Sequence, residues 1–205
     1  MNLVIEAIKK RRSVRSYKPE PVPKDIIQTV IDAGNWAPTG NNWQRWRFVV
    51  VEDNDFRQKL INAALPTWKR VLGGLIDSKD DHLREYFTAF FPRCLGWPPQ
   101  SYEETLSQAR DMEDGMYWGA PVVIFVIGTA AQDCAMVCQN MMLAATSLGL
   151  GRCIVGFGAQ VTGDDEIVAA LELQENERIY GPIVLGYSDI YPEPPKKKGP
   201  QVKWI

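Results

Sequence analysis

The sequence predicts an α+β fold, and two observations carry this prediction. Long helical patterns are clustered along the chain, and the few strand patterns do not alternate regularly with them, as they would in a doubly wound sheet. The pattern from Cys134 to Leu148 is helical and almost entirely apolar. Such a helix must be buried on most of its sides, and in a chain of 205 residues a subunit interface is a natural way to bury it.

The first third of the chain alternates between apolar residues at helical spacing and stretches broken by proline or glycine. Pro23 suits the first position of a helix, and Asp53 or Asn54 suits a helix cap. The expected elements are a helix over 2–12, an extended segment over Ser13–Pro23, a helix from Pro23 to about Gly34, a turn-rich stretch over Ala37–Gln44, a strand over Arg47–Val51 and a helix ending at Leu65.

Residues 66–118 are rich in proline, glycine and aromatic residues, and helical pieces are expected over Asp80–Phe90 and Ser101–Met112. Beyond Gly119 the patterns are sharper. The expected elements there are a central strand over Pro121–Ile127, a helix capped by Asp133 and ending at Leu148, a strand over Cys153–Phe157, a helix over Asp164–Leu171, a strand over Ile179–Tyr187 and a tail from Pro192 rich in proline and lysine.

Composition indicates one globular domain spanning 1–205, with residues 66–118 as a variable insert. The formal net charge of −2 gives no electrostatic reason to expect nucleic acid or an anionic membrane as a partner. The longest apolar run, Ala120–Ile127, is far shorter than the ~20 residues that span a bilayer. These features predict a cytoplasmic protein.

The cysteines and the single histidine do not suggest catalysis. Cys94, Cys134, Cys138 and Cys153 form no C-x-x-C pair, and the spacing of Cys134 and Cys138 predicts a buried helix face rather than a metal site. His82 lies in a charged stretch and is expected at the surface, so that no Ser-His-Asp or Cys-His arrangement is visible.

Four segments could hold a ligand. In Arg11–Ser16, three guanidinium groups and two hydroxyl groups could grip a phosphate, although cations at a helix end also offset its dipole. In Ala37–Gln44, amide side chains suit the edge of a pyrimidine-like ring, or form a plain turn. In Leu148–Gly158, glycines allow backbone to approach a flat ligand, or serve as a helix cap and a bulge. In Pro194–Pro200, lysines are solvated or add positive charge to a phosphate.

The order of these segments resembles that of the FMN-dependent nitroreductase family. Arg11–Tyr17 resembles the family's R-R-S-x-R-x-[FY] opening, and Ala37–Phe48 resembles its A-P-S-x-x-N-x-Q-P-W-x-F segment. Ala120–Val126 is similar to its A-P-V-x-I-x-V strand, and Gln139–Phe157 is similar to its long helix and G-L-G-x-C-x-x-G-F turn. The tail is similar to L-G-Y … P-x-K-x-R-x-P, with Lys198 in place of the arginine.

The resemblance implies a sandwich of a mainly antiparallel sheet flanked by helices, in an intertwined homodimer with FMN at the interface. Arg11 and Ser13 would then bind the phosphate of FMN with Arg12 nearby, and Arg15 would lie near the pyrimidine end of the ring. The partner subunit would supply Pro38, Thr39, Gly40, Asn42 and Gln44. Val155 and Gly156 would lie beside flavin N5, and Lys196 and Lys198 would reach the phosphate.

The implied activity is ping-pong transfer of a hydride from NADH or NADPH, through flavin N5, to a nitroaromatic compound, a quinone or an activated alkene. No side chain need act as a nucleophile or a metal ligand. The acceptor would be selected by the insert, whose aromatic residues could stack on it or pack among themselves: Tyr86, Phe87, Phe90, Phe91 and Trp97. Three other interpretations stay open: a dehalogenase, dehydrogenase or flavin-fragmenting relative; a flavin store or redox sensor with little turnover; and a helical interaction module without cofactor.

Overall fold

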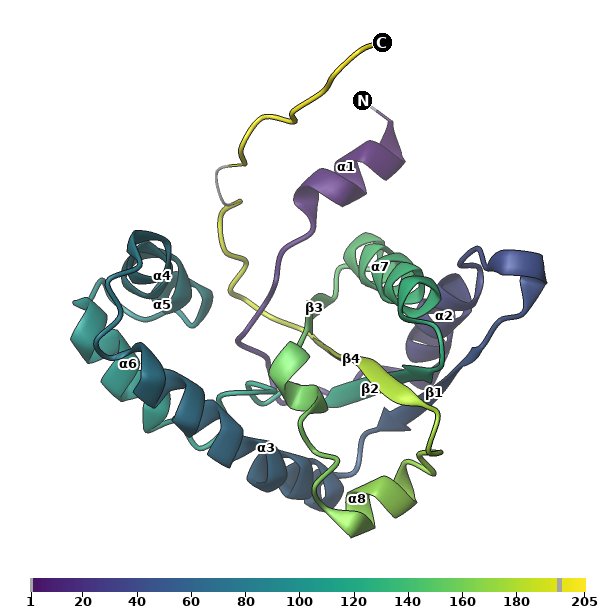
Figure 1. The fold of residues 1–205 in the computed structure, drawn as a ribbon, viewed down its shortest axis with the longest axis horizontal. Coiled ribbons are helices and arrows are strands. Elements are labelled where there is room, and N and C mark those ends of the chain that lie inside the picture. The colour runs from purple at the N-terminus through teal and green to yellow at the C-terminus, as the bar shows by residue number, and fades with distance from the viewer. Residues whose placement is uncertain (1, 195–196) are drawn as a thin grey trace.

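The computed structural model describes residues 2–194 and 197–205, and its centre is one antiparallel sheet. The strands are β1 (Trp46–Val51), β2 (Val122–Gly128), β3 (Gly151–Ile154) and β4 (Arg178–Gly186), in the order β1-β2-β4-β3. Each neighbouring pair runs antiparallel. Figure 1 shows helices on both faces of this sheet, so that the predicted α+β class is confirmed.

The two faces of the sheet carry separate apolar cores, and strand β2 contributes to both. Every residue of β2 is buried, and successive side chains point to opposite faces of a sheet. Val122, Ile124 and Val126 pack against α2 (Lys24–Asn35) and α7 (Ala131–Ser147), whereas Val123, Phe125 and Ile127 face α3 (Asn54–Leu75) and α8 (Asp165–Ala170). Such burial on both faces explains the unbroken apolar run of the sequence.

Helix α3 is longer than predicted, because it passes through Pro66 and ends at Leu75. A proline inside a helix costs about 3 kcal/mol. Leu60, Ala64, Trp68 and Leu72 recur every four residues and are all buried, so one face of the helix stays packed on both sides of the proline. This packing outweighs the local cost, which a sequence pattern alone does not reveal.

The insert beyond α3 is helical, and its buried side chains belong to the same apolar core as α3 and the face of β2 that carries Val123 and Phe125. It contains α4 (Asp81–Glu85), a π-helical turn η2 (Tyr86–Phe90), α5 (Phe91–Cys94) and α6 (Tyr102–Arg110). Ser101 caps α6 in a capping box with Glu104. Phe87 and Phe91 are buried with ring centroids 5.3 Å apart, which favours packing within the insert over stacking on a substrate for these two residues.

Two further expectations were wrong in detail. Helix α7 begins at Ala131 with Ala130 as its N-cap and no side-chain cap, so that Asp133 lies inside its first turn, where the carboxylate accepts a hydrogen bond of 2.7 Å from Thr39 Oγ1. The strand expected over Cys153–Phe157 is β3, which starts at Gly151 and ends at Ile154. From Gly156 the chain turns into a short 3-10 helix, η3 (Gly156–Ala159).

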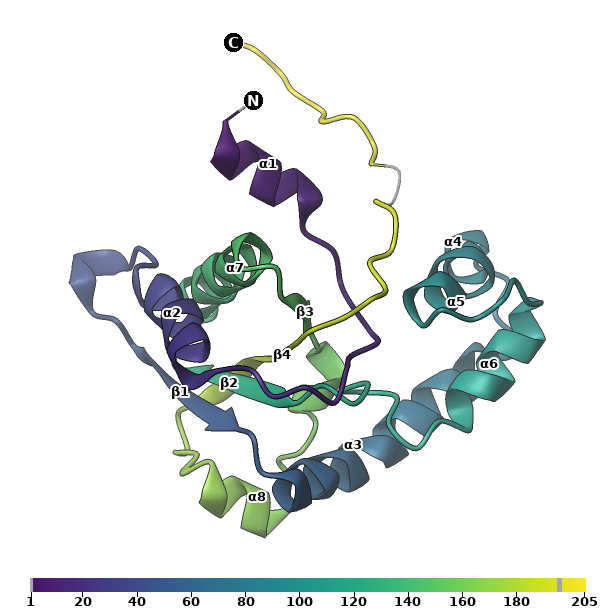
Figure 2. The ribbon, with the colours of Figure 1, turned by 180° about the vertical axis from the view of Figure 1, so that it is seen from behind.

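Both ends of the chain project beyond the sheet on the side of α7 (Figures 1 and 2). Helix α1 (Leu3–Lys10) buries no residue, and its Leu3 is 81% exposed. In the tail, Trp204 is 91% exposed and Val202 and Ile205 are also exposed. Large apolar side chains gathered in this way usually mark an interaction surface. In the part of the chain that is described, no helix combines the length and the apolar composition needed to cross a membrane.

Candidate functional site

The arginine-rich segment after α1 runs in an extended form beside β3. Arg11 is the C-cap of α1, and the Val14 amide then donates a 3.0 Å hydrogen bond to the Arg152 carbonyl. Val14 is fully buried, and the Tyr17 hydroxyl donates to its carbonyl at 2.8 Å. These contacts fix the segment against the sheet, although Arg152 stands about 140 residues further along the sequence.

Arg15 is held by three contacts. Its Nη1 donates to the Ser13 carbonyl at 3.2 Å and to Cys94 Sγ at 3.6 Å, and its guanidinium carbon lies 5.2 Å from the ring centroid of Trp118. Cys94 belongs to α5, so the insert touches the arginine segment here. Burial raises the pKa of the nearby Tyr86 phenol, and the positive charge of Arg15 acts in the opposite direction.

Two buried thiols adjoin this segment. Burial raises the pKa of Cys94 and of Cys153, and Arg15 opposes the rise in both cases. The Ser13 side chain also lowers the pKa of Cys153, which places Ser13 beside β3. Both thiols therefore stay protonated near neutral pH, unlike the thiolate of a catalytic cysteine.

The neighbouring Arg12 closes the end of α1. Its Nη1 donates to the carbonyls of Lys9 at 2.6 Å and of Arg11 at 2.8 Å. A cation bound to the last carbonyls of a helix also offsets the helix dipole. These contacts support the interpretation of Arg12 as a cation that stabilises the end of α1.

Arg152 was not anticipated as a site residue, but β3 brings it to the same place. It is only 2% exposed, and the positive charges of Arg11 and Arg12 act on it. The signal in the sequence was a charged residue directly before a short run of apolar strand character, Cys153–Val155. Among residues 2–194 and 197–205, no ion pair within 4.0 Å involves Arg11, Arg12, Arg15 or Arg152.

The segment after α2 is exposed and lies elsewhere. It includes a 3-10 turn, η1 (Gly40–Asn42), and Asn41, Asn42 and Gln44 have positive φ angles. Figures 1 and 2 show this turn at the edge of the molecule beyond α2, whereas the arginine segment passes β3 near its middle. A surface hollow of about 490 Å³ is lined by Pro38, Thr39, Gly40, Trp43, Arg45, Gln132, Asp133 and Met136. A single chain therefore does not bring the two segments together.

The glycine turn after β3 is open on one side. The Val155 amide donates to the Pro182 carbonyl at 2.9 Å, and Val155 is buried. Gly156 is exposed, and a Cβ atom added there would meet nothing within 4 Å. Ile154 and Phe157 are exposed on either side of it, so that the turn offers an apolar surface that a flat ligand could cover.

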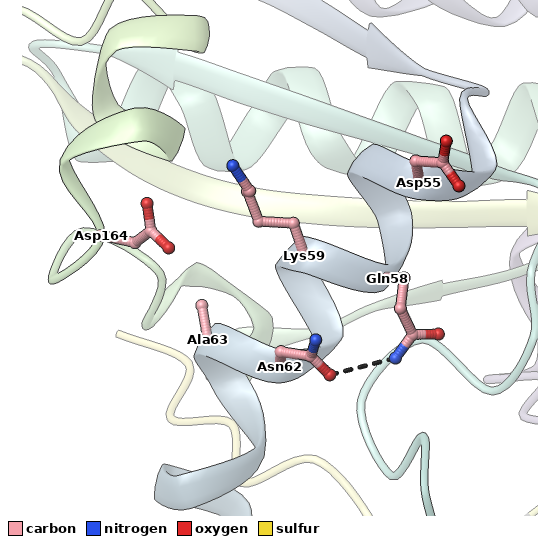
Figure 3. A pocket seen from close by; sticks show the side chains of 6 residues that line it. All are labelled: Asp55, Gln58, Lys59, Asn62, Ala63 and Asp164. Carbon is pink, nitrogen blue, oxygen red and sulfur yellow. Dashed lines mark hydrogen bonds between the residues drawn. The ribbon is translucent and has the colours of Figure 1, made fainter.

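Lys196 and Lys198 are the last of the expected site residues along the sequence. Lys196 lies outside the described residues, and Lys198 is exposed in the projecting tail. A hollow of about 570 Å³ lies between α3 and the start of α8, where Gln58 donates to Asn62 at 3.0 Å, and Figure 3 shows the side chains that line it. It is lined by Asp55, Gln58, Lys59, Asn62, Ala63 and Asp164, which include none of the expected site residues. Apart from Ala63, its lining residues have polar or charged side chains, whereas aliphatic and aromatic side chains predominate in ligand pockets.

Comparison with known proteins is consistent across sequence and structure. A model of the nitroreductase family matches residues 8–187. The nitrobenzene nitroreductase of Ectopseudomonas oleovorans is 26% identical over 207 residues, which cover 90% of this chain and 86% of that protein. The crystal structure of a nitroreductase with bound FMN from Bacteroides fragilis NCTC 9343 is 27% identical and has a TM-score of 0.68, with all of both chains covered.

A shorter match is to a protein named for a different activity. Iodotyrosine deiodinase 1 of Rattus norvegicus is 46% identical over 55 residues, which cover 27% of this chain and 19% of that protein. This match is higher in identity and much smaller in extent than the others.

Proposed function

The chain belongs to the nitroreductase family, and from that premise we propose that it binds FMN and catalyses hydride transfer from NADH or NADPH to a small electrophilic acceptor. When bound, FMN would supply the redox chemistry of hydride transfer through N5 of its ring. The proposed acceptors are nitroaromatic compounds, quinones and activated alkenes.

The unpaired arginines beside β3 are the observation that carries this proposal. Arg11, Arg15 and Arg152 gather around Cys153 of β3 without a carboxylate partner among the described residues. Like charges brought together in this way need an anion, and arginine binds phosphate oxygens with two parallel hydrogen bonds. The residues present therefore fit the dianionic phosphate of FMN, with Arg11 and Ser13 as its ligands.

Arg15 and the glycine turn fit the ring of FMN. The contacts with Ser13, Cys94 and Trp118 hold the guanidinium group of Arg15 in one place. A fixed cation at the pyrimidine end favours the flavin form that carries additional negative charge. The open surface at Gly156 leaves room for a planar group next to Val155, as proposed for the region of N5.

We propose a homodimer in which each subunit completes the site of the other. The segment Pro38–Gln44 is exposed and lies apart from the arginine segment of its own chain. Helix α1 and the tail expose apolar side chains that a second subunit would cover. With the partner's Pro38–Gln44 at the ring and Lys196 and Lys198 at the phosphate, the proposed cofactor site would be enclosed.

The insert is proposed as the lid that selects the acceptor. Cys94 contacts Arg15, and the Tyr86 phenol lies close enough to Arg15 for its pKa to respond to the charge. These contacts support a position of α4–α5 over the pyrimidine end. Tyr86 is only partly buried, so its ring could contact an acceptor, whereas Phe87 and Phe91 are buried beside it.

The visible absorption spectrum of the purified protein tests the proposal. We expect a yellow protein that is bleached within seconds by NADH or NADPH in the absence of oxygen, and recovers its colour when a nitroaromatic compound is added. A yellow protein that neither NADH nor NADPH bleaches would favour a flavin store or sensor. A colourless protein that gains no flavin spectrum after incubation with FMN would contradict the proposal.

The match to iodotyrosine deiodinase 1 favours a second candidate, the reductive dehalogenation of a halogenated phenol. In that reaction the carbon–halogen bond breaks, the carbon gains a proton and two electrons, and halide leaves. The same reduced protein, mixed without oxygen with a nitrobenzene or with a 2-iodophenol, separates the two candidates. Release of iodide at a rate that exceeds nitro reduction would favour the dehalogenase.

A further inference from the structure

Arg152 is buried in β3 with most of its hydrogen-bonding capacity unused. Its side chain is 2% exposed, and Nη1 donates to the Leu150 carbonyl at 3.0 Å. Nε and Nη2 have no hydrogen-bond partner among the described residues. These two nitrogens form the edge of a guanidinium group that binds a carboxylate or a phosphate with two parallel bonds.

The burial of this charge is unfavourable in the protein alone. Burial lowers the pKa of Arg152 to about 10, and the charges of Arg11 and Arg12 lower it further while the tyrosines Tyr191 and Tyr17 act in the opposite direction. A buried charge is normally paired, and leaving one unpaired is strongly destabilising. Since the strand neighbour opposite Arg152 is the apolar Leu185, an apolar side chain would pack at this position without that cost.

The position of Arg152 links it to the proposed phosphate ligands. Its backbone carbonyl accepts the hydrogen bond of Val14, and the next residue in the strand, Cys153, is influenced by the Ser13 side chain. Arg11 and Arg12 act on its charge. Cations from two distant parts of the sequence therefore lie near one another beside β3.

We propose that Arg152 is a further ligand of the FMN phosphate, which it binds through Nε and Nη2. This inference rests on the proposed function, because it takes FMN as the source of the anion. The dianionic phosphate supplies the charge that the arginines lack, and its oxygens can accept from several donors at once. The burial of Arg152 also means that the bond to phosphate forms away from bulk water, where a charged hydrogen bond is stronger.

Flavin affinity measured with and without the phosphate provides the test. The full chain is freed of flavin, and the quenching of flavin fluorescence gives Kd for FMN and for riboflavin, which has the same ring and no phosphate. In Arg152→Met we expect the Kd for FMN to rise about tenfold or more, as the loss of a charged hydrogen bond predicts. The Kd for riboflavin should change less than about twofold, since the ring contacts are retained.

Two further variants sharpen the test. Arg152→Lys keeps the charge and loses the paired donors, so its Kd for FMN should fall between those of the wild type and Arg152→Met. Arg178→Met removes the same charge from an exposed position at the other end of β4, and it should bind both flavins as the wild type does. Inorganic phosphate is the competing anion: it should raise the apparent Kd for FMN in the wild type and have less effect in Arg152→Met.

Thermal unfolding distinguishes a ligand from a structural residue. Without flavin, Arg152→Met should unfold at the same or a higher temperature than the wild type, because an unpaired buried charge has been removed. With FMN its gain in Tm should be smaller than that of the wild type.

Three results would overturn the inference: an unchanged Kd for FMN in Arg152→Met, an equal loss of FMN and riboflavin binding, or a lower Tm of the flavin-free variant. If the wild type itself bound no FMN, the proposed function would fail together with this inference.

Discussion

The ion pair between Arg47 and Glu177 is expected to anchor the start of β1, and its strength can be worked out from its geometry. Arg47 Nε donates to Glu177 Oε1 at 2.9 Å and Nη2 donates to Oε2 at 2.7 Å, so the pair is bidentate. Glu177 is 14% exposed and also accepts from the Gln174 amide at 3.0 Å. An exposed ion pair contributes about 0–1 kcal/mol. With two short bonds and a half-buried carboxylate, we expect a coupling of about 1–2 kcal/mol.

A double-mutant cycle in urea measures this coupling. Glu177→Gln, Arg47→Met and the double variant are unfolded at one protein concentration, which keeps any contribution of oligomerisation constant. Each kcal/mol should lower Tm by about 2–4 °C in a chain of this size. The single hydrogen bond between Arg84 and Glu103, whose side chains are 40% and 64% exposed, provides a weaker control pair.

The coupling should also depend on pH. The hydrogen bond from Arg47 is the first cause of the lowered pKa of Glu177. A lowered pKa in the folded state stabilises the protein above the unfolded pKa of glutamate, about 4.3, and this contribution is lost as the pH falls through the folded pKa. A coupling below about 0.3 kcal/mol at pH 7, or one that persists at pH 2, would contradict a stabilising ion pair between Arg47 and ionised Glu177.

Three other outcomes follow from the structure. Arg11→Ala combined with Ser13→Ala should raise the Kd for FMN at least about tenfold and leave riboflavin binding nearly unchanged, and an unchanged Kd for FMN in a fluorescence titration would contradict the phosphate assignment. Burial raises the pKa of Cys134 to about 11 and of Cys138 to about 12; a thiol reagent at pH 8 should therefore modify neither residue until the protein is unfolded, and rapid modification of the native protein would show that α7 is accessible. Removal of residues 199–205, which include the exposed tail side chains, should shift the proposed dimer towards monomer in sedimentation equilibrium, whereas an unchanged mass would exclude the tail from the interface.

Much of the fold could be predicted because each core element shows its burial in local periodicity. The run Val122–Ile127 is apolar at every position because both faces of β2 are covered, and the apolar α7 is buried against the sheet on one side. The expected bounds of β2 lie within one residue of the observed ones, and those of α7 lie within three. The second half of α3 escaped prediction because Pro66 interrupts a local pattern whose continuation depends on tertiary packing at Trp68 and Leu72.

The order of motifs along the sequence indicated the family, but it could not show which residues share a site. The charge of Arg11 acts on Arg152 only because the extended segment after α1 pairs with β3 through the Val14 amide. No rule of sequence spacing predicts that contact. Arg152 lies within the glycine-rich segment Leu148–Gly158. The glycines of that segment indicate a role for its backbone and give no signal for the side chain of Arg152.

The two halves of the proposed cofactor site differ in how much of their environment one chain provides. The arginine segment is anchored by a buried valine and by backbone hydrogen bonds, so its geometry exists before any ligand arrives. The segment Pro38–Gln44 is exposed and held chiefly by the bond from Thr39 to Asp133. If a second subunit orders that segment, flavin binding and dimer formation must be coupled, because each then removes part of the entropic cost of the other. Dilution of the flavin-free protein should consequently weaken its affinity for FMN, and an affinity that does not vary with protein concentration would show that one chain is sufficient.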